Sequence, residues 1–199
     1  MADGKATTTP GRLVVISGPS GVGKGTIVRR VLQQVPQAVL SVSLTTRRPR
    51  PGERDGIDYR FVSAETFGRM ADDGALLEWA EVHGNRYGTE AAAVDEAAAA
   101  GKIVILEIDV QGGLQIARRR PSARLILIAP PDDAELRRRL EGRGTDAPDV
   151  IERRLAKAHE EMRMARDSGC YNDEVVNDDL DVAVRRVVQL IRQENTQHD

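Results

Sequence analysis

Residues 13–24 read Leu13-Val14-Val15-Ile16-Ser17-Gly18-Pro19-Ser20-Gly21-Val22-Gly23-Lys24, and this stretch decides the fold. The run Leu13–Ser17 is short and apolar, as in strands that are buried on both faces of a parallel sheet. Glycines follow it directly, and a helical pattern continues from about Lys24 to Gln34. The stretch therefore predicts a strand, a glycine-rich loop and a helix in succession.

The loop of this unit fits the phosphate-loop pattern up to its lysine. Nucleotide phosphates need several backbone N–H groups aimed inward, which glycines permit, and the positive N-terminal end of the following helix attracts them. The lysine reaches the outer phosphates. The candidate phosphate-binding residues are Gly18, Pro19, Ser20, Gly21, Val22, Gly23, Lys24, Gly25 and Thr26.

Gly25 departs from the general pattern, because a Ser or Thr usually follows the lysine and supplies a hydroxyl to magnesium. Thr26 comes next, so the magnesium ligand stays open at this point. The alternative for the whole loop is a glycine-rich turn without a ligand. A GTPase of the usual kind is not expected, since such proteins read guanine with an Asn-Lys-x-Asp stretch and none of the four lysines follows an asparagine.

Two further apolar runs, Ile103–Ile108 and Leu125–Ala129, are linked to their neighbours through helical segments, and a last helix is expected from about Leu180 to Gln193. The predicted fold class is therefore α/β, with a P-loop NTPase-type parallel β-sheet flanked by helices and right-handed crossovers.

Two long segments interrupt this regular pattern. The first runs from Ser41 to about Gly101 and contains the stretch Tyr59–Val62, which predicts a strand in an inserted lobe with its own small mixed sheet. The second is dense in arginine and predicts a helical lid, two helices joined by a turn. The expected division is a tail at 1–11 and one domain at 12–194, with its core at about 12–41, 102–131 and 156–194, the lobe at about 42–101 and the lid at about 132–155.

The composition of the chain limits which cellular compartment and which binding partners we expect. The 199 residues carry a formal net charge of −2, which gives no overall attraction to nucleic acid or to anionic membranes. No apolar run approaches the roughly 18 residues that a membrane span needs. The N-terminus lacks the apolar stretch of a secretory signal, and the single cysteine, Cys170, cannot form an internal disulfide. We expect a cytoplasmic protein without a nucleic-acid or membrane partner.

The basic segment Thr45–Val62 offers groups that suit a phosphomonoester. Arg47 and Arg50 lie three residues apart, and the planar guanidinium group of an arginine can donate two parallel hydrogen bonds to a phosphate. Tyr59 adds a hydroxyl donor. The alternative interpretation is a solvated basic loop beside an exposed strand.

The order of residues in this segment resembles the signature of guanylate kinases. Thr-Thr-Arg is followed by Arg, Glu, Gly and Tyr, each three residues after the last, and then by Phe-Val, without a gap. The resemblance extends from about Arg12 to Ile191. It implies that Arg47, Arg50 and Tyr59 hold the phosphate of GMP, and that Ser43 lines the guanine pocket.

Residues 77–80 resemble the family segment that carries a guanine-reading glutamate. Guanine presents N1–H and its 2-amino group side by side, and one carboxylate can accept both hydrogen bonds, whereas adenine lacks that pair. Glu78 is therefore the expected base selector. Tyr87-Gly88-Thr89 resembles the next family element, which implies that Tyr87 holds the phosphate and Thr89 contacts the base. A helix cap is the alternative role for Thr89.

The stretch from Glu107 to Gly112 resembles the acidic strand end that lies beside both substrates in the family. The resemblance implies that Glu107 and Asp109 belong to the GMP site, and that Asp109 either contacts guanine or helps to organise magnesium. A paired acid at a strand end is the alternative for Glu107. The protein ligand to Mg²⁺ is thus expected at Thr26 or Asp109.

Residues 140–145 and 153–155 resemble the lid of the family, in which arginines close over the ATP phosphates. Phosphoryl transfer needs in-line placement, charge neutralisation and exclusion of water rather than a protein nucleophile. The resemblance implies this role for Arg139, Arg143 and Arg154, whereas Arg137 and Arg138 are interpreted as surface residues. Residues 175–178 resemble the last core strand, with Asn177 near adenine.

The implied activity is transfer of the γ-phosphoryl group of ATP to GMP, and to dGMP, with Mg²⁺ as the cofactor. The expected catalytic residues are Lys24, Arg47, Arg143 and Arg154. One alternative is an inactive guanylate-kinase-like module that binds phosphopeptides or GMP, which the intact loop lysine argues against. The other is a P-loop kinase with a different acceptor, which Glu78 and the ungapped signature argue against.

Overall fold

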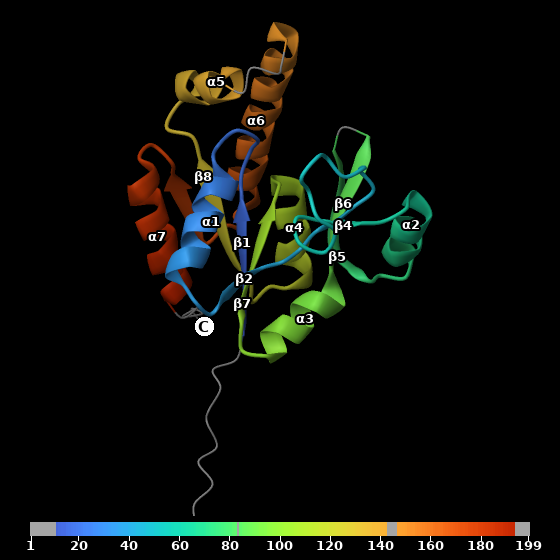
Figure 1. Ribbon diagram of the computed structural model, residues 1–199. Helices are drawn as coiled ribbons and strands as arrows, with labels where there is room; N and C mark the ends of the chain where they lie inside the picture. Colours follow the sequence, from blue (N-terminus) through green and yellow to red (C-terminus); the bar gives the residue numbers. More distant parts are fainter. Residues whose placement is uncertain (1–10, 83, 143–146, 194–199) are drawn as a thin grey trace, which may run out of the picture.

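A computed structural model describes residues 11–82, 84–142 and 147–193 (Figure 1). Its main sheet has five strands in the order β2-β7-β1-β8-β9. Every neighbouring pair in this sheet is parallel, as the apolar runs predict. The strands are β1 (Arg12–Ser17), β2 (Ala38–Leu40), β7 (Ile103–Ile108), β8 (Arg124–Ala129) and β9 (Asp173–Val176).

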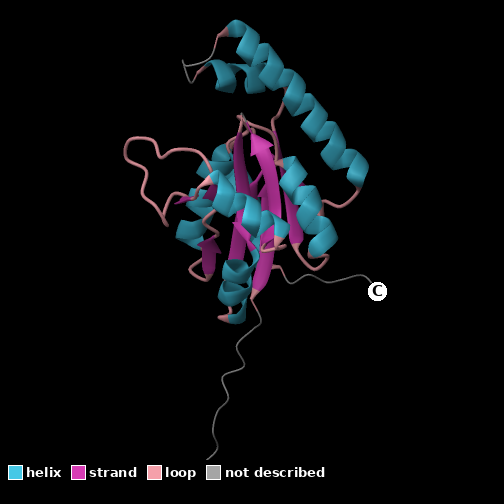
Figure 2. Ribbon diagram, turned by 90° about the vertical axis from the view of Figure 1, so that its right-hand side faces the viewer, coloured by secondary structure: helices cyan, strands magenta, loops and turns pink. Residues whose placement is uncertain are grey.

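Helices cover both faces of the main sheet, with the strands between them (Figure 2). Successive residues of a strand point to opposite faces, so Val14 and Ile16 join one buried cluster and Val15 joins another. The helices α1 (Lys24–Gln34) and α7 (Leu180–Arg192) pack on the first face, and α3 (Ala91–Ala99) and α4 (Val110–Arg119) pack on the second. Burial on both faces explains why the strands are continuously apolar.

A second sheet of four strands lies beside the main sheet, in the order β4-β3-β6-β5. Its strands are β3 (Leu44–Thr45), β4 (Arg60–Phe61), β5 (Leu76–Val82) and β6 (Asn85–Glu90), and α2 (Ala64–Asp72) covers it. Phe67 of α2 is fully buried against Leu44 and Leu76. We call residues 42–90 the small lobe; its last strand leads directly into α3.

The helices α5 (Asp133–Glu141) and α6 (Pro148–Ser168) extend beyond the carboxyl end of the main sheet (Figures 1 and 2). They correspond to the two helices expected in the arginine-dense segment, and the turn expected between them falls largely outside the described residues. Ile151 and Leu155 in the first half of α6 join the buried cluster that contains Leu136 of α5, whereas Met162 and Ala165 in its second half belong to another buried cluster. Within residues 11–82, 84–142 and 147–193, no helix is both long and apolar enough to cross a membrane.

The predicted α/β fold is confirmed, and the strand expected at 59–62 is shorter than predicted. It comprises Arg60 and Phe61, which pair in parallel with Leu44 and Thr45 of β3. The backbone on its N-terminal side turns instead, since the Phe61 N–H donates to Asp55 Oδ1 at 2.8 Å and closes the preceding loop.

Candidate active site

A cavity of about 850 Å³ opens at the carboxyl ends of β1 and β7. Ligands of open α/β sheets bind at this end of the strands. The phosphate loop, the small lobe and α6 all contribute to its wall. It gathers the following residues that the sequence analysis singled out: Gly18, Ser20, Lys24, Ser43, Arg47, Arg50, Tyr59, Glu78, Tyr87, Glu107, Asp109 and Arg154.

The loop between β1 and α1 has a backbone that requires glycine. Gly18 has φ +150°, and a Cβ at this position would lie 2.3 Å from the carbonyl oxygen of Ile128. Gly23 has φ +92° and directly precedes the first residue of α1. Lys24 begins that helix, and its ammonium donates to the carbonyl oxygens of Gly18 at 2.6 Å and Pro19 at 3.0 Å. The lysine is therefore folded over the loop that is expected to receive phosphates.

Gly25 faces a carboxylate, because a Cβ there would lie 3.1 Å from Glu107 Oε1. Burial raises the pKa of Glu107, and the positive charges of Lys24 and Arg29 oppose this shift. The hydroxyl of Thr26 accepts a long hydrogen bond of 3.4 Å from Arg29. Glu107 thus places a carboxylate beside Gly25, and the first hydroxyl after the lysine belongs to Thr26.

Arg47 is fixed in place from two sides. Its Nη2 atom lies 2.8 Å from Glu53 Oε1, and its guanidinium lies 5.3 Å from the centre of the Tyr59 ring. The other oxygen of Glu53 accepts from the backbone N–H of Arg50 at 2.7 Å. Only 13% of the Arg47 side chain is exposed, whereas Arg50 and most of the loop up to Asp58 are exposed.

Glu53 is a residue that the sequence reasoning missed as part of the site. It belongs to the signature, three residues after Arg50, and that spacing was the available signal. Hydrogen bonds from Arg47 and from the backbone of Arg50 lower its pKa, so it stays ionised. Tyr59 and Tyr87 meet edge to face with ring centres 5.9 Å apart, and burial raises the pKa of Tyr59.

Glu78 is the most enclosed acid of the cavity, with 4% of its surface exposed. Its Oε1 atom accepts a hydrogen bond of 2.6 Å from the hydroxyl of Thr89. Burial raises the pKa of Glu78 to about 7, although the Thr89 bond acts in the opposite direction. A Cβ on Gly112 would lie 2.7 Å from Glu78 Oε2, so the glycine leaves room for the carboxylate.

Thr89 does not cap a helix, so the alternative role considered for it is wrong. It is fully buried in β6, and the residue that precedes α3 is Glu90, which makes no side-chain cap. Asp109 does cap a helix: its Oδ1 atom accepts from the Gly112 N–H at the start of α4 at 2.8 Å. Asp109 is thereby fixed beside the cavity.

Two side chains of α4 bind the open edge of β5, which carries Glu78. Gln115 accepts from the Trp79 N–H at 3.2 Å and donates to the Trp79 carbonyl at 2.8 Å. Arg119 donates to the carbonyl oxygens of Leu76 at 2.6 Å and Leu77 at 3.1 Å. We call these contacts the α4–β5 clamp. Sequence reasoning missed it; the only signal was two polar side chains four residues apart, which share a helix face.

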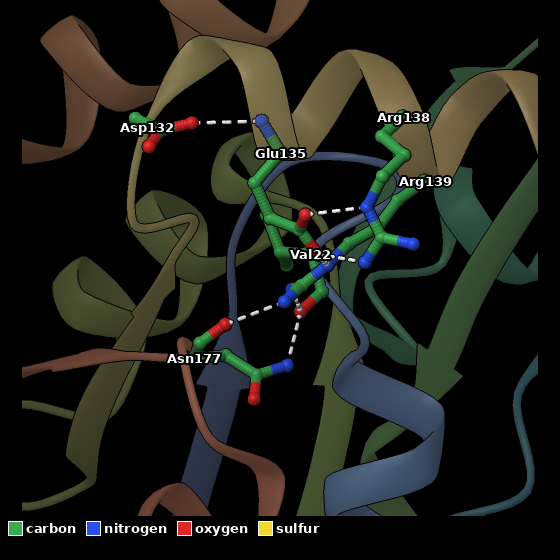
Figure 3. A network of polar contacts seen from close by, with 6 residues as sticks. All are labelled: Val22, Asp132, Glu135, Arg138, Arg139 and Asn177. Carbon is green, nitrogen blue, oxygen red and sulfur yellow. Dashed lines mark hydrogen bonds and ion pairs between the residues drawn. The ribbon is translucent and has the colours of Figure 1, made fainter.

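On the opposite side of the phosphate loop, Arg139 joins α5 to the loop and to β9 (Figure 3). It donates to Glu135 Oε1 at 2.6 Å and to the carbonyl oxygen of Asn177 at 2.8 Å. The amide of Asn177 donates to the carbonyl oxygen of Val22 at 2.7 Å, and its Oδ1 atom is buried without a hydrogen-bond partner among the described residues. Both residues brace the loop, and their expected contacts with ATP stay predictions.

The other arginines of α5 and α6 divide between surface pairs and the cavity. Arg138 pairs with Glu135 and Arg137 with Glu152, which agrees with the surface role expected for both arginines. Arg154 donates to the Ser20 hydroxyl at 2.7 Å, so α6 already touches the phosphate loop. The expected catalytic residue Arg143 lies outside the described residues.

Comparison with known proteins identifies the family. The model of the guanylate kinase family matches residues 10–194. The chain is 51% identical to the guanylate kinase of Anaeromyxobacter dehalogenans over 95% of its own length and 83% of the relative's. It is 50% identical to that of Rubrobacter xylanophilus over 92% and 94% of the two chains.

A solved structure agrees with these sequence matches. The crystal structure of guanylate kinase from Anaplasma phagocytophilum is 32% identical and superposes with a TM-score of 0.76, over 96% of this chain and 89% of that one. A cavity that joins a phosphate loop to a buried carboxylate, in a chain matched over nearly its whole length, leads to one conclusion: this chain belongs to the guanylate kinase family.

Proposed function

We propose that the cavity between the phosphate loop and the small lobe is where this kinase transfers the γ-phosphoryl group of ATP to GMP, giving ADP and GDP, and that dGMP is accepted as well. The observation that carries the proposal is Glu78, a buried carboxylate held by Thr89 in the same cavity as Lys24. A carboxylate at this place is suited to accept the two adjacent guanine donors.

The donor nucleotide is assigned to the phosphate loop. Its backbone N–H groups and the start of α1 receive the phosphates, and Lys24 exchanges its contacts with the loop carbonyls for the outer phosphate oxygens. Arg154 and Arg143 add positive charge as the transferred group becomes more negative on its peripheral oxygens. Arg139 and Asn177 hold the loop in shape, with Asn177 at the adenine side.

The acceptor GMP is assigned to the small lobe. Arg47, Arg50 and the hydroxyls of Tyr59 and Tyr87 receive its phosphate, and Glu53 keeps Arg47 aimed before the substrate arrives. Glu78, Thr89 and Ser43 surround the base. Glu107 and Asp109 complete the wall between the two substrates.

Magnesium is proposed to enter with the phosphates of ATP. Among the residues that the structure describes, no group of three or more His, Cys, Asp or Glu side chains forms a metal site. Mg²⁺ commonly keeps several waters and takes one or two protein oxygens plus substrate phosphates, which the oxygens of Thr26 and Asp109 beside the loop can supply. The bound ion would neutralise charge on the phosphates.

The division of the chain is proposed as a core with two moving parts. The GMP-binding lobe spans about 42–101, with α3 as the helix that connects it to the main sheet, and the lid spans about 132–155. Closure of both parts would exclude water from the phosphates. The chemistry suits the cytoplasm, where both nucleotides are available.

Lys24→Ala tests the mechanism. The variant should lose roughly 10²- to 10³-fold in kcat with GMP, as expected when one electrostatic donor is removed. Its affinity for GMP, measured by calorimetry, should stay within about twofold because Lys24 belongs to the donor side. Near-normal turnover would contradict the assignment of the phosphate loop. An active parent and a variant that still binds GMP also exclude the inactive-module alternative.

A further inference from the structure

The helix α6 presents one face to the cavity, and Lys157 and Glu161 on that face have no role so far. The face comprises Val150, Arg153, Arg154, Lys157 and Glu161, which all line the cavity. Arg154, Lys157 and Glu161 follow one another at intervals of three and four residues. Arg154 has been assigned to the ATP phosphates. Lys157 and Glu161 lie further along the same face.

Contacts on either side place Lys157 over the phosphate loop. One turn before it, Arg154 donates to the hydroxyl of Ser20 in the loop at 2.7 Å. One turn after it, Glu161 lies close enough to Lys24 and Asp109 for their charges to act on its carboxyl group. Lys157 therefore lies between Arg154, which contacts Ser20, and Glu161, whose carboxyl group is within electrostatic range of Lys24.

The ion pair between Lys157 and Glu161 is long, and its two side chains differ in exposure. The Nζ atom of Lys157 lies 3.7 Å from Glu161 Oε1, which is longer than a normal hydrogen bond. Only 7% of the Glu161 side chain is exposed, compared with 45% of the Lys157 side chain. The carboxylate is thus enclosed, while the ammonium is at the end of a flexible stem that can turn into the cavity.

We propose that Lys157 is a further catalytic residue, whose ammonium leaves Glu161 and binds the transferred phosphoryl group when both nucleotides are bound. This role rests on the assignment of ATP to the phosphate loop. The transferred group carries its charge on three peripheral oxygens, so an added cation on the lid side stabilises it together with Lys24. In the free protein Glu161 holds the ammonium near this position.

The first test compares variants of Lys157. Lys157→Gln keeps the length of the side chain and removes the charge; it should lower kcat at least tenfold and leave the KM for GMP within about twofold. Lys157→Arg keeps the charge and should retain most of the activity. The matched control is Lys102→Gln, which changes a lysine between α3 and β7, away from the residues that line the cavity; its kcat should equal that of the parent.

The second test addresses Glu161. Glu161→Gln removes the carboxylate that competes for Lys157, so the affinity for a non-hydrolysable ATP analogue, measured by calorimetry with GMP bound, should rise a few-fold. The same change in a Lys157→Gln background should give a smaller gain, because the competing cation is absent and only the repulsion between Glu161 and the phosphates is removed.

Four results would overturn the proposal. A kcat of Lys157→Gln within twofold of the parent would exclude the role, and so would equal losses in Lys157→Gln and Lys157→Arg, because the second result points to packing rather than charge. An identical gain from Glu161→Gln in both backgrounds would exclude the competition for Lys157. Absence of turnover in the parent would overturn the proposed function and this role with it.

Discussion

Glu78 and Glu53 are two carboxylates of the small lobe whose surroundings shift their pKa values in opposite directions. Glu53 receives hydrogen bonds from Arg47 and the Arg50 backbone, which lower its pKa. Glu78 is enclosed, and burial raises its pKa to about 7. Glu53 is thus a permanent anion that aims an arginine, whereas Glu78 can gain or lose a proton near neutral pH.

The raised pKa of Glu78 predicts pH-dependent recognition of guanine. The ionised form is proposed to accept both guanine donors, so affinity for guanosine should increase from pH 5.5 through about 7 and level off above about pH 8. Guanosine is the preferred probe because it lacks the phosphate, whose own second pKa is about 6. NMR titrations should show this rise of guanosine affinity with pH in the parent and no such rise in Glu78→Gln. Equal guanosine affinity at pH 6 and pH 8 in the parent would refute the prediction.

The same group links pH to stability. The folded state binds the proton of Glu78 more tightly than the unfolded chain, whose carboxyl has a pKa near 4.5. Its contribution to the free energy of unfolding is therefore fully present below about pH 4.5 and is lost as pH rises through about 7. Urea titrations between pH 5 and 8 should show that the free energy of unfolding decreases more steeply with pH in the parent than in Glu78→Gln. An equal pH dependence in the two proteins would contradict this prediction.

At the scale of elements, the α4–β5 clamp sets where the strand that carries Glu78 lies. The small sheet leaves one edge of β5 without a neighbouring strand, and Gln115 and Arg119 of α4 satisfy backbone groups along it. Asp109 and Gly112 at the start of α4 lie beside the same strand. A shift of β5 along α4 would therefore move Glu78 within the cavity.

Gln115→Ala should raise the KM for GMP several-fold and leave the KM for ATP unchanged, because the clamp positions the acceptor lobe only. Loss of the two hydrogen bonds should reduce the free energy of unfolding by about 1 kcal/mol. Gln33→Ala, at an exposed position of α1, is the matched control. Equal changes in both KM values would indicate general loosening rather than positioning.

The elements also show what the sequence could predict. The strands β1, β7 and β8 and the helices α1 and α7 were predicted to within a residue, because continuous apolar runs and helical periodicity are local signals. The strand β2 and the two-residue strand β3 have no such signal, since they exist through pairing with distant residues, and β4 was predicted two residues too long. The α4–β5 clamp could not be predicted from the sequence either, because it depends on the edge of β5 lying next to α4.

At the scale of the whole molecule, the cavity joins three segments that are far apart in the chain. The sequence predicted most of the lining residues through spacing and family resemblance, including Lys24, Arg47 and Glu78. It could not predict Lys157 and Glu161, because only the packing of α6 shows which of its faces points to the loop. The charge states of Glu78 and Glu107 likewise depend on burial, which no local pattern reveals.

The central claim is that one cavity binds ATP at the phosphate loop and selects GMP through Glu78. The most direct measurement offers GMP, AMP, CMP and UMP in turn to the purified protein with ATP and Mg²⁺, and follows ADP release. Parallel assays use Glu78→Gln. We expect rapid turnover with GMP alone in the parent, and a GMP-to-AMP preference that falls at least roughly tenfold in the variant, whose amide cannot accept both guanine donors. Turnover with another nucleotide, or an unchanged preference in Glu78→Gln, would contradict the claim.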